Sequence, residues 1–219
     1  MSQRPAGGRV RAVSFAGPAG VLEGLWKEAS APPQGSAVFA HPHPLHGGTL
    51  HNKVVHRAAR ALSGAGYATL RFNFRGVGAS EGVYDGGRGE TGDFRAALAE
   101  AERLAGLPIV AGGFSFGAAV ALRSIAGDGR SRVAACIVAG LPLATDSGAD
   151  LPKPEVPALF VVGERDVFGP PALVRQFAPG SSRVVEIPGA DHFFEGKLDQ
   201  LEEAVAGFLA SFPVPAGAP

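Results

Sequence analysis

Ser115 is the residue of this chain whose neighbours suit it best for chemistry. It is the centre of Gly113-Phe114-Ser115-Phe116-Gly117, which follows an apolar run and precedes the small residues Ala118-Ala119. An apolar strand, a Gly-x-Ser-x-Gly turn and a helix together form a nucleophile elbow, which holds a serine hydroxyl clear of the backbone. Glycine on both flanks removes Cβ atoms that would collide in so tight a turn. The pattern therefore predicts that Ser115 is a nucleophile.

A serine hydroxyl needs a base within hydrogen-bonding distance, and that base needs an acid to orient it. Asp166 follows the apolar run Leu159–Val162, and His192 follows the run Arg183–Ile187. In open α/β sheets, functional groups gather on the loops at the carboxyl ends of the strands. We therefore expect His192 to be the base and Asp166 to be the acid.

Two other carboxylates lie close to this pair in the sequence. Asp191 is adjacent to His192, and neighbouring side chains rarely point at one another. Glu164 is nearer than Asp166 to the end of its strand and is expected to point elsewhere. Asp166 is therefore the preferred acid. Its structural alternative is a helix cap for the segment that begins at Pro170.

Acyl transfer also requires N–H donors for the oxyanion of the tetrahedral intermediate. The first expected donor is the backbone N–H of Phe116, directly after the nucleophile. The second should come from the loop His41-Pro42-His43-Pro44-Leu45-His46-Gly47-Gly48. Proline has no N–H, so two residues of this loop are excluded. His43 and Leu45 remain, and the distance from the end of the strand slightly favours His43.

The elements that must position these residues alternate between strands and helices, after a first antiparallel hairpin. Continuous apolar runs are typical of strands that are covered on both faces in a parallel sheet. We expect a single α/β domain over residues 9–212, between flexible tails at 1–8 and 213–219, with Thr91 or Asp93 near the cap of its second helix. The expected strands are Val10–Phe15, Val21–Trp26, Ala37–Ala40, Tyr67–Phe74, Leu107–Gly113, Arg132–Ala139, Val156–Val162 and Arg183–Ile187. The expected helices are Asn52–Ala65, Thr91–Ala105, Ala118–Ile125, Pro171–Phe177 and Lys197–Phe212.

Together, the elbow at Ser115, the Asp166 loop, the His192 loop and the glycine loop Arg75-Gly76-Val77-Gly78-Ala79-Ser80 resemble the α/β-hydrolase superfamily. The resemblance covers roughly Val10–Phe212. It implies an eight-stranded, mostly parallel sheet whose second strand is antiparallel, with helices on both faces. It also implies that the serine, the aspartate and the histidine form a catalytic triad.

A narrower resemblance is to small bacterial hydrolases without a cap domain, which are related to dienelactone hydrolases and small carboxylesterases. It rests on His41-Pro42-His43-Pro44, on Arg71–Gly78 and on Gly189–Phe194. Dienelactone hydrolases themselves use a cysteine where Ser115 stands, which argues against a dienelactone substrate.

The connection from Leu141 to Glu155 is too short for a helical cap and is rich in proline, glycine and aspartate. We therefore expect an open, shallow site for a small-molecule ester with a short acyl group, or for an acyl group on a larger exposed carrier. A thioesterase or a small-peptide serine peptidase would use the same triad. The aromatic and aliphatic residues expected to line the site, unless most of them are simply core, are Phe114, Phe116, Leu141, Phe168 and Phe193.

Two other classes of function have weaker support. The first is a metal-dependent hydrolase. His41-x-His43-x-x-His46 is similar to the metal-ligand signature His-x-His-x-Asp-His, but Leu45 replaces the aspartate. The alternative is that these histidines bind the backbone of the oxyanion loop. A non-catalytic binding protein would not need all three triad residues.

The glycine loop does not indicate a nucleotide site, because Gly76-x-Gly78 is followed by Glu81 where Gly-x-Gly-x-x-Gly requires a third glycine. We expect a tight turn instead, with Arg75 in a structural hydrogen bond or ion pair.

The composition narrows the remaining choices. The formal net charge is +0 and the chain has no Lys/Arg run, which argues against nucleic acid and anionic lipid. The single cysteine, Cys136, lies in an apolar run, so a disulfide framework is excluded. Neither a signal peptide nor a membrane span is recognisable. We expect a cytoplasmic enzyme that needs no metal or organic cofactor; the natural substrate and the oligomeric state stay open.

Overall fold

The computed structural model describes residues 8–29, 33–106, 108–126 and 133–211. The expected tails, apart from Gly8, lie outside the described residues. So do Leu107, Arg132 and Phe212, with which three of the expected elements begin or end.

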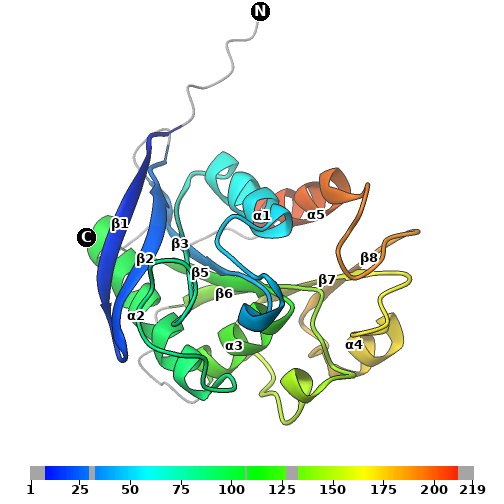
Figure 1. The fold of residues 1–219 in the computed structure, drawn as a ribbon. Coiled ribbons are helices and arrows are strands. Elements are labelled where there is room, and N and C mark those ends of the chain that lie inside the picture. The colour runs from blue at the N-terminus through cyan, green and yellow to red at the C-terminus, as the bar shows by residue number, and fades with distance from the viewer. Residues whose placement is uncertain (1–7, 30–32, 107, 127–132, 212–219) are drawn as a thin grey trace, which may run out of the picture.

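The centre of the molecule is one eight-stranded sheet (Figure 1). Its strands are β1 (Val10–Gly17), β2 (Gly20–Lys27), β3 (Gly35–Ala40), β4 (Tyr67–Phe72), β5 (Ile109–Phe114), β6 (Val133–Ala139), β7 (Ala158–Gly163) and β8 (Arg183–Ile187). They lie in the order β1-β2-β4-β3-β5-β6-β7-β8. β2 pairs antiparallel with both β1 and β4, and all the other pairs are parallel. This confirms the expected sheet with its antiparallel second strand.

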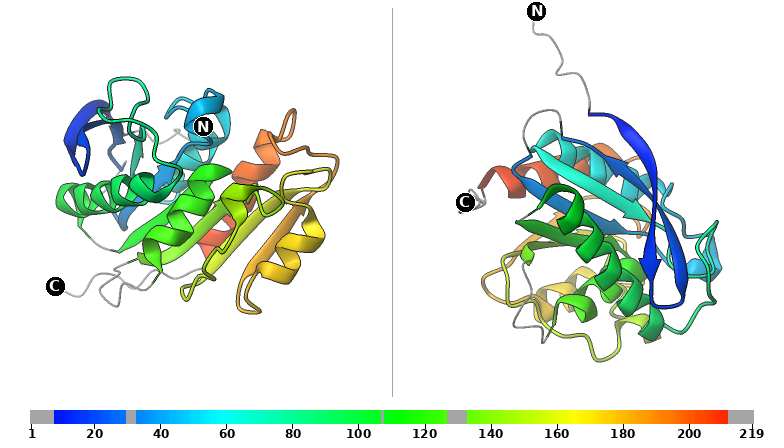
Figure 2. Two further views of the ribbon diagram at one scale, coloured as in Figure 1. Left: turned by 60° about the horizontal axis from the view of Figure 1, so that its bottom comes forward. Right: turned by 90° about the vertical axis from the view of Figure 1, so that its left-hand side faces the viewer.

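Helices cover both faces of the sheet, as expected. They are α1 (Lys53–Gly64), α2 (Arg88–Ala105), α3 (Phe116–Ile125), α4 (Pro171–Phe177) and α5 (Leu198–Ser211). Figure 1 and the left view of Figure 2 show α1 and α5 on one side and α2, α3 and α4 on the other. The central strands are buried on both sides, which explains their continuous apolar sequences. In β6, Ile137 packs in the layer of α1 and α5, whereas Cys136 and Val138 pack in the layer of α3 and α4.

The start of α2 differs from the prediction. The helix begins at Arg88, almost one turn before Thr91, and neither Thr91 nor Asp93 caps it. Its first turn is closed instead by the buried carboxylate of Glu90, which accepts the N–H groups of Asp85 (2.9 Å) and Gly87 (2.7 Å). A carboxylate at the third helical position can satisfy N–H groups that have no partner inside the helix.

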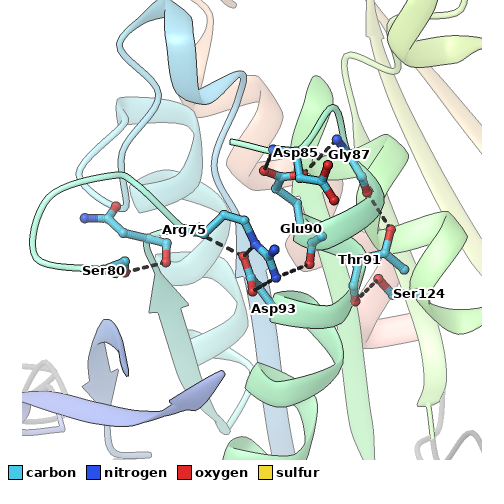
Figure 3. A network of polar contacts seen from close by, with 10 residues as sticks. Arg75, Ser80, Asp85, Gly87, Glu90, Thr91, Asp93 and Ser124 are labelled. Carbon is cyan, nitrogen blue, oxygen red and sulfur yellow. Dashed lines mark hydrogen bonds and ion pairs between the residues drawn. The ribbon is translucent and has the colours of Figure 1, made fainter. Parts of the chain in front are cut away.

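Asp93 instead forms a buried ion pair with Arg75, which lies in the loop after β4 (Figure 3). The guanidinium donates from Nε to Oδ2 at 2.9 Å and from Nη2 to Oδ1 at 2.7 Å, and Nη2 also donates to the Gly89 carbonyl at 2.8 Å. The hydrogen bond to Asp93 raises the pKa of Arg75. The expected structural role of Arg75 is confirmed, and the following turn has φ values of 73° at Gly76 and 59° at Gly78.

No cap domain is present between β6 and β7. Every residue from 140 to 157 is described, and this connection contains one short 3-10 turn, η2 (Asp146–Gly148). Within the described part of the chain, no helix combines the length and apolarity needed to cross a bilayer.

Candidate active site

Ser115 lies at the sharp turn between β5 and α3, with φ 55° and ψ −120°. A Cβ on Gly113 would lie 2.4 Å from the carbonyl carbon of Gly117, and a Cβ on Gly117 would lie 2.4 Å from the carbonyl oxygen of His41. Both distances are shorter than any real contact, so the turn requires glycine at both positions. The Ser115 N–H donates to the carbonyl of Ala139 in β6 at 2.9 Å, which fixes the turn to the sheet.

The structure brings Ser115, His192 and Asp166 into one chain of hydrogen bonds. His192 Nε2 lies 2.9 Å from Ser115 Oγ, and His192 Nδ1 lies 2.8 Å from Asp166 Oδ2. Because a carboxylate can only accept, Nδ1 carries the proton and Nε2 is free to accept from the serine hydroxyl. This arrangement can remove the serine proton.

The elements around Asp166 hold its carboxylate in place. Its Oδ1 accepts the N–H groups of Phe168 at 2.9 Å and Gly169 at 3.0 Å, in the loop after β7. Asp166 is only 2 % exposed and His192 only 5 % exposed. Backbone N–H groups and the imidazole together replace the water that a buried carboxylate loses.

The two rival carboxylates both bind backbone N–H groups of the loop after β8, which carries His192. Glu164 accepts from Gly189 at 2.6 Å. Asp191 Oδ1 accepts from Phe193 at 3.0 Å and Glu195 at 3.1 Å, and so shapes the loop that carries His192.

The loop after β3 contributes the 3-10 turn η1 (Pro44–His46). Its Leu45 N–H donates to His43 Nδ1 at 3.2 Å, and the Leu45 side chain is 67 % exposed. The His43 carbonyl accepts the N–H groups of His46 and Gly48, both at 3.1 Å. Phe116 is the first residue of α3, so its N–H has no carbonyl partner within the helix.

His41 is fully buried and bridges two backbone segments. Its Nδ1 lies 2.6 Å from the carbonyl of Pro42, and its Nε2 accepts the N–H of Phe74 at 3.0 Å. Desolvation lowers the pKa of His41 to about 4, so the ring is neutral near pH 7. His41 therefore joins the loop after β3 to the loop that follows β4.

These hydrogen bonds argue against a metal site on the histidine loop, because they occupy the ring nitrogens that would bind the ion. Both ring nitrogens of His41 are engaged, and those of His43 bind the Leu45 N–H and the hydroxyl of Tyr84. Among the residues that the structure describes, no three His, Cys, Asp or Glu side chains are grouped as a metal site would need. Cys136 is buried, and burial raises its pKa to about 12, which leaves it a protonated core thiol.

A cavity of about 560 Å³ opens above Ser115. Phe116, Phe168 and Phe193 line it, and Phe193 is 50 % exposed at its rim. Its lining residues are Pro42, His43, His46, Gly47, Asn52, Tyr84, Ser115, Phe116, Pro142, Thr145, Asp146, Ser147, Phe168, His192 and Phe193.

The prediction that Phe114 and Leu141 line this cavity is wrong, because both side chains belong to the core. The strand alternation of β5 turns Phe114 toward the layer of α1 and α5, where it packs on Phe194. The centroid of its ring lies 5.2 Å from that of His192, so Phe114 packs against the imidazole from the core side. Leu141 packs in the core cluster on the opposite face.

The sequence prediction missed Tyr84 and the segment Thr145–Ser147, which also line the cavity. No motif marks either segment. The only sequence feature that could have indicated Tyr84 as a cavity residue is that it is aromatic and lies in a glycine-rich loop between a strand and a helix.

Residues 34–204 match the family model of the alpha/beta hydrolase domain. The chain belongs to this family. Among curated proteins, this α/β hydrolase is 33% identical over 211 residues to an uncharacterized protein of Rickettsia prowazekii, a match that covers 90% of this chain and 87% of the relative.

Two similar solved structures cover nearly the whole α/β hydrolase. An alpha-beta serine hydrolase homologue from Coxiella burnetii has a TM-score of 0.81 and 37% identity, covering 90% of this chain and 96% of its own. A serine hydrolase without a lid from Xanthomonas campestris has a TM-score of 0.85 and 31% identity, covering 96% and 97%. These similarities agree with the observed fold, which also lacks a cap.

Proposed function

We propose that this protein is a serine hydrolase that cleaves small or exposed carboxylic esters through an acyl-enzyme on Ser115. The observation that carries the proposal is the hydrogen-bonded series from Ser115 Oγ through His192 to Asp166. The α/β-hydrolase family and the two serine hydrolase structures support hydrolase activity.

The reaction has two acyl-transfer steps. His192 Nε2 takes the proton of Ser115 Oγ while that oxygen attacks the ester carbonyl carbon. His192 then gives this proton to the departing alcohol oxygen, which leaves the acyl group on Ser115. In the second step His192 takes a proton from water, the hydroxide attacks the acyl carbon, and the proton returns to Ser115 as the acid departs. Asp166 stabilises the imidazolium formed in both steps.

The proposed oxyanion donors are the backbone N–H groups of Phe116 and His43. Leu45 is the less suitable candidate because its N–H already donates to His43 Nδ1. His43 and Phe116 line the cavity on the same side, with their rings 5.0 Å apart between centroids. Removing one oxyanion donor from such a site typically costs about 10²–10³ in kcat.

The cavity supports an ester with a short acyl group. Its volume of about 560 Å³ lies in the range that holds small-molecule ligands. The phenylalanines Phe116, Phe168 and Phe193 contribute to its apolar surface, and the exposed Phe168 and Phe193 at the rim would let part of a larger carrier remain outside.

The decisive experiment compares the hydrolysis of p-nitrophenyl acetate and butyrate by the wild type and by Ser115→Ala. We expect kcat to fall by roughly a thousandfold or more, because the covalent step is lost. Ser14→Ala is the matched control, since Ser14 is exposed on β1 and lies far from Ser115 in the sheet order; it should keep full activity.

Other results would replace the proposal. Ester hydrolysis that survives Ser115→Ala but disappears with a chelator would favour a metal site on the histidine loop. Faster turnover of matched thioesters or peptide amides than of esters would favour a thioesterase or a peptidase. The absence of turnover and of fluorophosphonate labelling at Ser115 would favour a binding protein.

A further inference from the structure

Tyr84 lines the active-site cavity, although it does not directly follow a strand and belongs to no motif. It is half-buried in the loop between β4 and α2 and lines the cavity together with Ser115 and Phe116. Its hydroxyl lies 3.1 Å from His43 Nε2, and its ring lies 5.9 Å from that of Phe116, between centroids. Tyr84 therefore stands on the side of the cavity that carries the proposed oxyanion donors.

The neighbours of His43 determine which group donates in the hydrogen bond between Tyr84 and His43 Nε2. The Leu45 N–H donates to His43 Nδ1, so Nδ1 must be unprotonated. Burial and the nearby His46 lower the pKa of His43, which keeps the ring neutral near pH 7. A neutral imidazole without a proton on Nδ1 carries it on Nε2, and His43 is therefore the donor to the Tyr84 oxygen. The phenolic proton of Tyr84 is left for another acceptor.

Among the residues that the structure describes, no acceptor takes this proton. Tyr84 lines the cavity, so its O–H can donate to a molecule that occupies it. This is a donor whose position is set by the protein before a ligand arrives, a condition that lowers the cost of binding.

The loop that carries Tyr84 is held by buried hydrogen bonds at both ends (Figure 3). On one side Arg75 is bound by Asp93, and on the other Glu90 accepts the N–H groups of Asp85 and Gly87. Asp85 directly follows Tyr84, so the buried Glu90 carboxylate fixes the backbone next to the tyrosine. The buried carboxylates of Glu90 and Asp93 thus hold this segment against α2.

We propose that Tyr84 is a substrate-positioning residue whose O–H donates to an acceptor oxygen of the substrate other than the carbonyl under attack. The inference rests on the proposed esterase function and narrows its substrate class. The preferred ester carries a second oxygen, as an oxo, ether or further ester group, within reach of the oxyanion side of the cavity. Hydrocarbon esters of the same length bind without this hydrogen bond.

The test uses pairs of esters that differ only in the second oxygen. On the acyl side, p-nitrophenyl 4-oxopentanoate and 5-oxohexanoate are compared with the pentanoate and hexanoate. On the alcohol side, 2-oxopropyl butyrate is compared with propyl butyrate. For at least one pair, Tyr84→Phe should lower kcat/KM of the oxygenated ester by about threefold to tenfold more than that of the hydrocarbon ester, mainly through KM.

The controls separate the possible failures. Tyr67→Phe removes the hydroxyl of the chain's other tyrosine, which is buried in the core, and should leave the ratio within each pair unchanged. Wild-type hydrolysis of the hydrocarbon esters that depends on Ser115 tests the proposed function on its own. With that activity present, the Tyr84 proposal is overturned if Tyr84→Phe alters no pair ratio. It is also overturned if the variant lowers kcat equally for all esters, because Tyr84 would then act on the oxyanion.

Discussion

At the scale of single residues, His41 and His43 lie in one loop but hold their protons on opposite ring nitrogens. His41 accepts the Phe74 N–H at Nε2 and so carries its proton on Nδ1, whereas His43 accepts the Leu45 N–H at Nδ1 and carries its proton on Nε2. Each ring is neutral because burial lowers its pKa. Two tautomers of one residue type thus fix the shape of this loop.

The buried His41 should make the stability of the fold depend on pH. Its pKa is about 4 in the folded state and near 6.5 in the unfolded chain. Between these values the unfolded state binds more protons, so the free energy of unfolding rises with pH. The contribution is complete above about pH 6.5, is lost as the pH falls toward 4, and amounts to roughly 3 kcal/mol over the whole window.

Urea denaturation of the wild type and of His41→Asn between pH 7 and pH 4.5 measures this effect. The free energy of unfolding should fall more steeply with acidification in the wild type than in the variant. Equal slopes for the two proteins would show that His41 is not the titrating group.

The sequence predicts the position of a site residue well where that residue follows a strand. It does not predict which side of the sheet a side chain faces. Ser115, Asp166 and His192 could be placed together because the carboxyl ends of parallel strands meet at one edge of a sheet. Phe114 and Leu141 were assigned to the pocket from their apolarity and their nearness to other site residues. Neither property says which face of the sheet a side chain takes.

At the scale of elements, the turn between β5 and α3 depends on backbones that nearly touch. Gly117→Ala places a Cβ against main-chain atoms of Ala40 and His41, which have no side-chain freedom to move away. We expect a loss of stability of roughly 1–3 kcal/mol, as for other overpacked sites, together with reduced ester turnover. Urea denaturation and kcat measured on the same sample test both effects.

Gly64→Ala is the matched control for that substitution. Gly64 is the last residue of α1, and a Cβ there would meet nothing within 4 Å. Alanine should be neutral or stabilise the protein by up to about 1 kcal/mol. Similar losses at both positions would mean that the contacts at Gly117 are not what restricts it.

The start of α2 shows what an element prediction from sequence lacks. Residue preferences favour Thr91 or Asp93 as the cap. The helix instead begins directly after Gly87, which has no side chain to cap it. Glu90 closes the turn from inside the helix, and Asp93 binds Arg75 of the loop after β4. The loop conformation that makes this possible depends on distant packing, which local residue preferences do not contain.

At the scale of the whole molecule, the α/β class followed from the alternation of strands and helices. The eight-stranded sheet with its antiparallel second strand followed from the resemblance to α/β hydrolases, and the order of the strands was not predicted. The absence of a cap followed from the short, Pro- and Gly-rich connection after β6. The shape of the cavity did not follow, because Tyr84 and Thr145–Ser147 reach it from loops far apart in the sequence.

The missing cap predicts ordinary saturation kinetics. Between β6 and β7 there is one 3-10 turn and nothing that must be displaced for an ester to reach Ser115. The rate of tributyrin hydrolysis should therefore rise hyperbolically with concentration, with no step where the substrate forms droplets. Titrated release of acid across the solubility limit measures this. A sharp increase at that limit would indicate interfacial activation and a mobile cover over the site.

The contacts around the elbow have a practical consequence. The φ of 55° at Ser115 and the close packing of backbone around Gly113 and Gly117 exist only while β3, β5 and α3 are assembled. An unfolded or misassembled chain would leave the serine as unreactive as any free alcohol. A covalent serine titrant would then count natively folded molecules directly, so one stoichiometric measurement would report the quality of a preparation.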